Sequence, residues 1–316
     1  MPELPEVETV ARGLQSAVAG RRILTVTLRK TDFIDDPAAL ERELPGRHIV
    51  RVERFGKFML LQLAAATTGP ASAYELAENS QPIEPSAEAL LVHLGMTGHL
   101  APHFAEQPLA KHTHVTFVLD DGRELRYVDA RRFGRMAYLS GAALATELER
   151  FGADPLLVTR EEFAKRVHAS RSRIKALLLD QTVLRGVGNI YADEALWKAR
   201  IHPAKIGARL APAELETLRK ELRKILLKAI ELRGSSISDF VDARGIPGDY
   251  QQHHKVYGRE GEKCFRCGTK IRRIIVAGRS SHFCPHCQPA PRGVSNARRH
   301  SGRKTKRNRP RATSKR

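Results

Sequence analysis

The sequence lacks any apolar run that approaches the roughly 20 residues of a membrane-spanning helix. Its first six residues also lack the basic start and the apolar stretch of a secretory signal peptide. Cysteine is scarce, because the 316 residues include only 4, all of them between positions 264 and 287. These absences argue against a membrane protein and against a secreted disulfide framework. We therefore expect a cytoplasmic protein without a membrane segment.

Acidic residues are missing from the last part of the chain. Residues 290–316 contain eleven Lys or Arg residues and no Asp or Glu. The whole chain has 54 basic and 35 acidic residues, a formal net charge of +19, and residues 1–289 alone keep a net charge of +8. This balance predicts a polyanionic partner such as nucleic acid even without the tail. The tail itself is expected to be disordered.

The rest of the chain has the composition of a folded protein, with 41% hydrophobic and 28% charged residues. Apolar residues recur at helical spacing between Pro5 and Gly20, which predicts a helix near the start of the chain. Short alternating segments follow, and Asp121-Gly122 is a favoured hairpin turn between two of them. Residues 1–140 are therefore predicted to form a mainly antiparallel β domain, with a surface insertion at residues 64–88. Helical patterns then predict an all-α domain over residues 141–254.

The cysteines form two Cys-x2-Cys pairs separated by sixteen residues: Cys264 and Cys267, then Cys284 and Cys287. This spacing is typical of two knuckles that close a tetrahedral thiolate site. We expect one structural Zn2+ within residues 255–289, with a redox pair or an iron–sulfur site as alternatives. Hairpin arms are predicted around Gly278-Arg279. Arg279 is then either an ordinary exposed tip or a cation that contacts a phosphate backbone.

The N-terminus offers a possible nucleophile. Removal of the initiator methionine would leave Pro2 as a free secondary amine. Amines at protein N-termini lose their proton near about pH 8, so a useful fraction is neutral at physiological pH and can attack a sugar C1′ to form an iminium. Glu3 and Glu6 lie beside it at the start of the predicted helix, where carboxylates are favoured. The alternative interpretation is that Met1-Pro2-Glu3 merely begins a helix.

Six segments occur in a characteristic order: Met1-Pro2-Glu3-Leu4-Pro5-Glu6-Val7-Glu8-Thr9, Gly56-Lys57, His93-Leu94-Gly95-Met96-Thr97-Gly98, Asp129-Ala130-Arg131-Arg132-Phe133-Gly134, Gly186-Val187-Gly188-Asn189-Ile190-Tyr191-Ala192 and the four-cysteine module. With these motifs the chain resembles the formamidopyrimidine-DNA glycosylases, bacterial enzymes that remove oxidised purines. The resemblance covers nearly all of residues 2–287.

The resemblance implies an α+β fold of several domains. An N-terminal helix with an antiparallel β-sandwich is expected over residues 1–140, and a helix–two-turn–helix domain over residues 141–254. A zinc-ribbon hairpin is expected over residues 255–289, and the basic tail over residues 290–316.

A bifunctional glycosylase and abasic-site lyase is also implied. Pro2 matches the amine that attacks C1′ and displaces the damaged base, and Glu3 matches the proton donor that assists opening of the sugar. Glu6 is expected to be a supporting carboxylate. Lys57 matches the lysine credited with protonation in β-elimination. Arg279 matches the zinc-hairpin arginine assigned to phosphate binding and δ-elimination.

The implied DNA contacts fall into two groups. The side chains that match the family's inserted triad, which fills the gap left by an extruded base, are Met96, Arg131 and Phe133. The side chains expected on the phosphate side are His112, Arg171, Lys175 and Asn189. Taken alone, methionine and phenylalanine are more often core residues, and a single histidine at the end of a strand is usually solvated.

The expected partner is double-stranded DNA with oxidised bases or abasic sites, bound by a monomer that associates with the nucleoid. Two departures from the family pattern are Ala130, where proline is usual, and Asp249, where an aromatic residue is common in the loop that covers the base. An endonuclease VIII-like enzyme for oxidised pyrimidines is one alternative, although Leu4 favours the purine branch. The other is a catalytically silent zinc-ribbon DNA-binding protein, which would have no need of an amine nucleophile.

Overall fold

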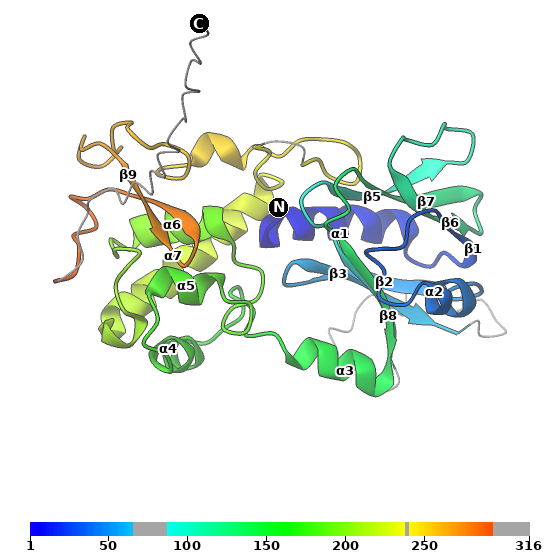
Figure 1. Cartoon of the computed structure of the whole chain (residues 1–316), viewed down its shortest axis with the longest axis horizontal. Helices are drawn as coiled ribbons and strands as arrows, with labels where there is room; N and C mark the ends of the chain where they lie inside the picture. The colour runs from blue at the N-terminus through cyan, green and yellow to red at the C-terminus, as the bar shows by residue number, and fades with distance from the viewer. Residues whose placement is uncertain (66–86, 238–239, 293–316) are drawn as a thin grey trace, which may run out of the picture.

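The computed structural model describes residues 1–65, 87–237 and 240–292 (Figure 1). Most of the expected insertion at residues 64–88 and of the tail at residues 290–316 therefore lies outside the described residues. Two groups of elements are visible: strands on one side, and helices with a small hairpin on the other (Figure 1). None of the helices within the described residues is long and apolar enough to cross a membrane.

Helix α1 (Leu4–Val18) begins where the two groups of elements meet and runs from there in among the strands (Figure 1). Its apolar face buries Val7, Val10, Leu14 and Val18 against the strands. Leu4, at its first turn, belongs instead to the core of the helical part. Because α1 packs on both groups, the N-terminus is held where they meet.

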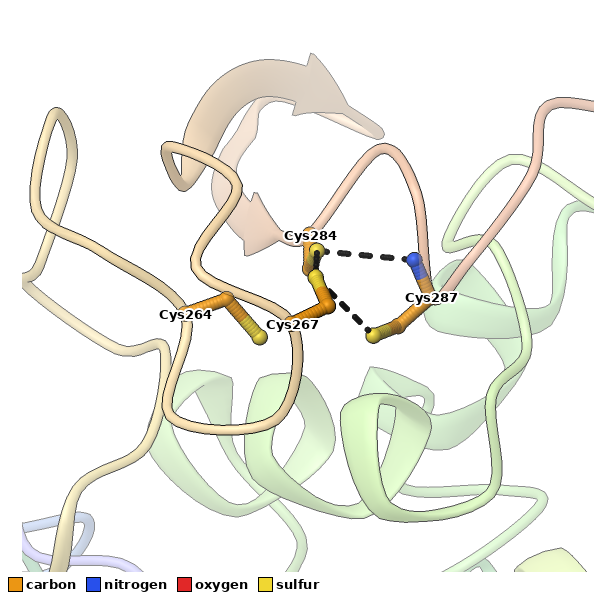
Figure 2. Close-up of side chains that lie close together, drawn as sticks. All are labelled: Cys264, Cys267, Cys284 and Cys287. Carbon is orange, nitrogen blue, oxygen red and sulfur yellow. Dashed lines mark hydrogen bonds between the residues drawn. The ribbon is translucent and has the colours of Figure 1, made fainter.

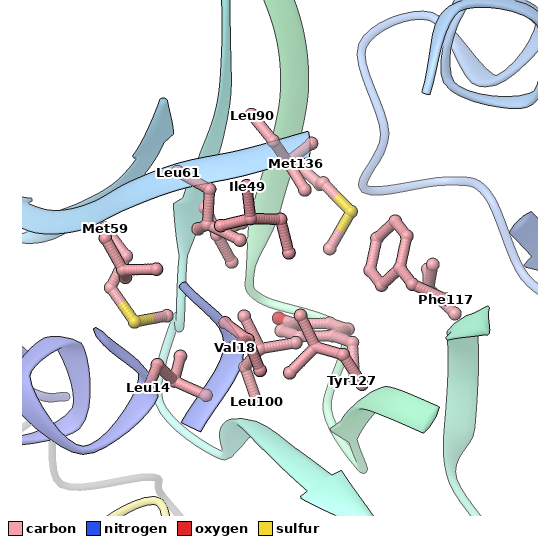
Figure 3. Close-up of a cluster of buried hydrophobic side chains, with 14 of the residues drawn as sticks. Leu14, Val18, Ile49, Met59, Leu61, Leu90, Leu100, Phe117, Tyr127 and Met136 are labelled. Atoms are coloured by element: carbon pink, nitrogen blue, oxygen red, sulfur yellow. The ribbon is translucent and has the colours of Figure 1, made fainter. Parts of the chain in front are cut away.

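The strands form two antiparallel four-stranded sheets, which confirms the predicted β-sandwich. One has the order β1 (Ile23–Leu28), β6 (Thr113–Leu119), β7 (Arg123–Asp129) and β5 (Gly98–Phe104). The other has the order β2 (His48–Phe55), β3 (Phe58–Ala64), β4 (Glu88–His93) and β8 (Arg135–Ser140). Side chains from both sheets and from α1 fill the space between them, including Ile49, Leu61, Phe117 and Tyr127 (Figure 3).

Two short helices accompany the sandwich, α2 (Pro37–Glu43) and α3 (Gly141–Glu149). The helical part contains α4 (Arg160–His168), α5 (Ile174–Leu179), α6 (Asn189–Lys198) and α7 (Pro212–Glu231), with short 3-10 turns at Gly207–Arg209 and Tyr250–His253. Thr159 caps α4, because its hydroxyl oxygen accepts a hydrogen bond of 3.2 Å from the Glu162 amide.

A two-stranded hairpin follows, formed by β9 (Arg272–Val276) and β10 (Arg279–Phe283). Its turn residues Ala277 and Gly278 have φ angles of +49° and +72°. Positive φ at both central residues is the signature of a tight hairpin turn, and it places Arg279 at the tip.

An ion-pair network joins the two halves beside the β2–β3 turn. The Arg54 guanidinium, with 8% of its side chain exposed, donates 2.8 Å hydrogen bonds to Glu8 of α1 and to Asp154 of the helical part. The Arg185 guanidinium covers the Phe55 ring at 4.3 Å from its centroid. These contacts fix the turn that carries Lys57 against the loop before α6.

Candidate active site

A cavity of about 730 Å3 opens where the start of α1, the β2–β3 turn, the start of α6 and the tip of the β9–β10 hairpin meet. Eight residues singled out from the sequence line it: Pro2, Glu3, Glu6, Lys57, Met96, Phe133, Asn189 and Arg279. They come from segments up to about 280 positions apart in the sequence. The fold thus assembles a single site from residues that are distant along the chain.

Glu3 is buried against the N-terminus of α6. Its carboxylate oxygens accept hydrogen bonds from the backbone amides of Ile190 at 3.1 Å and Tyr191 at 3.5 Å. Burial raises the pKa of Glu3 to about 7, against the opposing effect of the nearby Lys57 ammonium. Near neutral pH a substantial fraction of this carboxyl is therefore protonated and able to donate a proton.

Gly188 is required for this arrangement. A Cβ atom at position 188 would lie 2.1 Å from Cδ of Glu3. Only a residue without a side chain lets the start of α6 approach the carboxylate this closely. The glycine-rich loop therefore serves the acid as well as the helix.

Glu6 is held by three donors. Its carboxylate oxygens accept hydrogen bonds from the Tyr191 hydroxyl at 2.5 Å, the Ser235 amide at 2.7 Å and the Glu3 amide at 2.8 Å. Burial raises the pKa of this carboxyl as well. Because these partners fix Glu6 and connect α1 to α6, the geometry suits the supporting role expected for it.

Lys57 and Arg279 bring positive charge to the cavity. Burial lowers the pKa of the Lys57 ammonium, an effect that Glu3 opposes and Arg279 reinforces. Arg279 is exposed at the hairpin tip, and its guanidinium has no ion-pair partner among the described residues. A lysine with a lowered pKa gives up its proton more readily than an ordinary lysine, and a free guanidinium can bind phosphate.

Pro2 is buried at the cavity wall, and Met1 precedes it at the cavity mouth with 52% of its surface exposed. While Met1 is attached, the Pro2 nitrogen is an amide and cannot act as a nucleophile. The chemistry expected of this nitrogen therefore requires removal of Met1.

Two neighbouring loops present the three side chains expected to fill a gap in the DNA. Met96 and Phe133 are exposed by 42% and 55%, and the Arg131 guanidinium lies 4.6 Å from the centroid of the Phe133 ring. Asp129 organises these loops. Its carboxylate accepts hydrogen bonds from the Thr97 hydroxyl at 2.6 Å, the Gly134 amide at 3.0 Å and the Arg131 amide at 3.2 Å. Exposed apolar groups on an ordered loop are the opposite of the core placement that their residue types favour.

The residues expected to contact DNA phosphates do not lie together in the structure. Asn189 begins α6, and its amide nitrogen donates to the Ser280 hydroxyl at 3.2 Å. Arg171 is exposed before α5, and His112 is half-buried before β6, both away from the cavity lining.

The position of Lys175 contradicts the prediction that this lysine contacts a DNA phosphate. Its side chain is fully buried, and Nζ contacts Asp193 Oδ1 at 2.6 Å and the Ser280 carbonyl at 2.5 Å. A lysine held in this way is not available to a phosphate. It instead joins α5 to the residue that follows Arg279.

Sequence reasoning missed several lining residues, four of which lie after α7. Tyr257, Ser235, Ile237 and Phe240 all contribute to the cavity wall. They belong to the segment after α7, where the sequence shows no clear periodicity. No local pattern could have identified them, because their position depends on how this segment returns across α1.

The four cysteine sulfurs lie within 4.8 Å of one another (Figure 2). The Cys267 and Cys284 sulfurs are 3.4 Å apart, and the Cys287 amide donates to the Cys284 sulfur at 3.4 Å. Zn–S bonds of about 2.3 Å in a tetrahedron separate the sulfurs by slightly less than 4 Å, so the cluster fits one Zn2+. A complete thiolate shell leaves no position for substrate, and such a metal is structural.

Three family models match the chain in succession. They are the formamidopyrimidine-DNA glycosylase N-terminal domain over residues 1–136, the H2TH domain of the same glycosylase over residues 151–241, and a zinc finger found in FPG and IleRS over residues 261–290. This succession, folded around one cavity, defines a base-excision DNA-repair glycosylase with a helix–two-turn–helix domain and a site for one zinc ion.

Individual relatives match more than nine tenths of the chain. The formamidopyrimidine-DNA glycosylases of Symbiobacterium thermophilum and Solibacter usitatus are 42% and 43% identical, over 93% and 91% of this chain and 92% and 99% of theirs. The chain belongs to the formamidopyrimidine-DNA glycosylase family, of which abasic-site lyase activity is characteristic.

Solved structures agree with this assignment. A complex of the Lactococcus lactis Fpg (MutM) with DNA containing N7-benzyl-Fapy-dG has a TM-score of 0.79 and 34% identity. A MutM complex with DNA containing carbocyclic 8-oxo-G has a TM-score of 0.78 and 34% identity. Each alignment covers 92% of this chain and 100% of the other.

Proposed function

We propose that, once Met1 is removed, the Pro2 nitrogen attacks C1′ of an oxidised purine nucleotide extruded from duplex DNA into the cavity. The N–C1′ bond forms as the bond from C1′ to the base breaks, and the base leaves with the electron pair. The Pro2 nitrogen loses its proton in this step, and the departing base takes one up. The proposal rests on one observation above all: Pro2, Glu3, Lys57 and Arg279 line one cavity although they come from three segments that are far apart in the sequence.

Glu3 is the proton donor for ring opening. As O4′ leaves C1′ with its bonding electrons, it takes the Glu3 proton, and C1′ becomes an iminium bonded to Pro2. The raised pKa of Glu3, caused by burial, supports this role near neutral pH. In β-elimination a base then takes a proton from C2′, a double bond forms between C2′ and C3′, and the 3′ phosphate leaves with the electron pair of the C3′–O bond. Lys57 protonates the departing phosphate oxygen. Arg279 binds phosphate and assists δ-elimination of the second phosphate of the sugar.

The exposed loops contact the duplex. Met96, Arg131 and Phe133 fill the space vacated by the extruded base, where flat or long apolar groups beside a planar cation offset lost stacking. Asn189, Arg171 and His112 contact the phosphate backbone. We propose no DNA contact for Lys175, because it is buried in an ion pair.

The proposal includes a division of the chain into four parts: the β-sandwich at residues 1–140, the helical domain at 141–254, the zinc finger at 255–289 and the basic tail at 290–316. One chain supplies every proposed catalytic group, which supports action as a monomer. The relatives named above are bacterial. Because the chain is basic and acts on DNA, we expect it to associate with the DNA of the nucleoid.

Borohydride trapping tests the proposal on a duplex with one 8-oxoguanine opposite cytosine. Wild type, shown by mass spectrometry to lack Met1, is expected to form a covalent adduct that Pro2→Gly and Glu3→Gln lose or strongly reduce. Lys220→Ala, which changes an exposed lysine of α7, is the control. A wild-type adduct that forms only on an oxidised pyrimidine would overturn the purine assignment. No adduct on any lesion or abasic site, with duplex binding intact, would overturn the amine mechanism.

A further inference from the structure

The β9–β10 hairpin carries Arg279 well away from the cysteine cluster. Arg279 precedes Cys284, the nearest cysteine along the chain, by five positions. A strand rises about 3.3 Å per residue, so the tip lies up to about 17 Å from the nearest zinc ligand. The hairpin forms a sheet of only two strands, and such a hairpin is marginally stable by itself. A metal at the cysteines can therefore fix the base of the hairpin, but the tip needs an anchor of its own.

Asp193 of α6 and Lys175 of α5 provide this anchor. Lys175 Nζ donates hydrogen bonds to Asp193 Oδ1 at 2.6 Å and to the Ser280 carbonyl at 2.5 Å. Asp193 Oδ2 accepts hydrogen bonds from the backbone amide of His282 at 2.8 Å and from its ring Nδ1 at 3.1 Å. The two side chains thus hold β10 at Ser280, directly after Arg279, and again at His282.

The burial of this ion pair indicates what it is for. Neither side chain is exposed to solvent. Taking two charges out of water is costly, and apolar residues of similar volume often stabilise a fold as well as a buried ion pair does. Stability alone therefore does not account for the pair. An ion pair adds geometry, because its hydrogen bonds form only over a narrow range of distance and angle.

We propose that Asp193 and Lys175 are positioning residues that hold Arg279 at its place in the cavity and, through Arg279, set the rate of δ-elimination. The inference rests on the role proposed above for Arg279. Arg279 is exposed at the hairpin tip, so the strand that follows it determines where its guanidinium reaches. A displacement of about 1 Å at a catalytic group can cost about 10²-fold in rate. Neither Asp193 nor Lys175 has to touch DNA for this effect.

Single-turnover cleavage of a duplex with a preformed abasic site tests the proposal in the full chain, because this substrate needs no base excision. A strand that stops after β-elimination ends in the unsaturated sugar, and a strand that continues through δ-elimination ends in a phosphate. Gel electrophoresis separates the two. Asp193→Asn leaves one acceptor oxygen where the carboxylate served three donors. We expect δ-elimination to be about tenfold slower, with β-elimination near the wild-type rate.

Two further variants control for stability. Ile225→Val trims the helical core, a cluster that contains no hairpin residue within the described part of the chain, and should leave both rates unchanged. Asp193→Asn alone leaves the Lys175 charge buried without a counter-charge and can fail to fold. Lys175→Met combined with Asp193→Asn removes both charges, is expected to fold, and should show the same slow δ-elimination.

Arg279→Gln separates this inference from the role proposed for Arg279. It should slow δ-elimination at least as much as Asp193→Asn, and combining the two changes should add nothing, because Asp193 acts only through Arg279. Wild-type δ-elimination by Arg279→Gln would overturn the role of Arg279 and this inference with it. A slow Arg279→Gln beside a folded Asp193→Asn of wild-type rate would overturn this inference alone. Additive losses in the combined variant, or an equal loss in Ile225→Val, would do the same.

Discussion

The proposed catalytic role of Glu3 and the stability of the fold make different demands on its carboxyl group. Its proposed role needs a proton near neutral pH, and the same burial that keeps the proton in place makes the ionised form costly. Two backbone amides at the start of α6 only partly offset that cost. The pH dependence of stability should therefore reveal this residue without any measurement of activity.

Replacement of Glu3 by glutamine should stabilise the protein at alkaline pH. The pKa of Glu3 is raised from 4.5 to about 7, so its contribution to stability is fully present below pH 4.5 and is lost as the pH rises through 7. Glutamine stays neutral throughout. The free energy of unfolding of Glu3→Gln relative to wild type should thus increase by about 3 kcal/mol between pH 4.5 and pH 8.5. Chemical denaturation at several pH values measures this, with the exposed Glu41→Gln as the charge control; parallel pH curves for wild type and Glu3→Gln would contradict it.

Gly188 provides a second test at the residue scale. A Cβ at this position meets Cδ of Glu3 at 2.1 Å, so Gly188→Ala must displace the proposed acid. A misplaced proton donor costs about 10²-fold or more in rate. Single-turnover excision from an 8-oxoguanine duplex should fall by that factor while zinc content and duplex binding are retained. Gly46→Ala strains a backbone at φ +87° but meets nothing within 4 Å and lies away from the cavity, so it controls for general destabilisation. Wild-type excision by Gly188→Ala would show that Glu3 tolerates displacement.

At the scale of elements, local signals decided what the sequence could predict. The α1 periodicity, the Asp121-Gly122 hairpin and the paired cysteines all appear in the structure. Pro102 and two histidines interrupt the alternation of strand β5 (Gly98–Phe104), so no local pattern predicts this strand. It tolerates proline because it lies at a sheet edge. Lys175 was misassigned because its partners lie 18 and 105 positions away, so no local pattern shows that it is buried.

The loop after β7 depends on one buried carboxylate. Asp129 accepts hydrogen bonds from both neighbouring loops, so Asp129→Asn leaves donors facing an amide group. The loop that presents Arg131 and Phe133 should then lose order. We expect about tenfold weaker binding of a lesion duplex, equivalent to about 1.4 kcal/mol.

Fluorescence anisotropy measures that affinity, and borohydride trapping at saturating DNA should be little changed. Asp32→Asn is a matched control, because Asp32 pairs with Arg132 of the same loop through an exposed contact of little energetic value. Equal affinities of Asp129→Asn and wild type would show that the loop holds its shape without the carboxylate. Equal losses in both variants would attribute the effect to charge alone.

At the scale of the whole molecule, the site exists only because the β-sandwich and the helical part are held together. α1 contributes Leu4 to the helical core and Val7 to the sandwich core. Arg54 connects Glu8 to Asp154 beside the Lys57 turn. Separate sequence motifs identified many of the residues that line the cavity. That these residues meet in one cavity depends on the contacts between the β-sandwich and the helical part, which no single motif contains.

Charge acts over the whole molecule as well, and the basic tail offers the clearest test. Deletion of residues 290–316 removes eleven basic residues and lowers the net charge from +19 to +8. Each phosphate that a protein neutralises adds about 0.9 to the slope of log K against log salt. The truncated chain should therefore bind duplex DNA more weakly, with a shallower salt dependence, while single-turnover trapping at saturating DNA stays the same because every cavity residue is retained.

A variant with a Gly/Ser tail of equal length separates the effect of the tail's charge from that of its length and should match the truncated chain. An unchanged slope after deletion would mean that the duplex is attracted by the folded body alone.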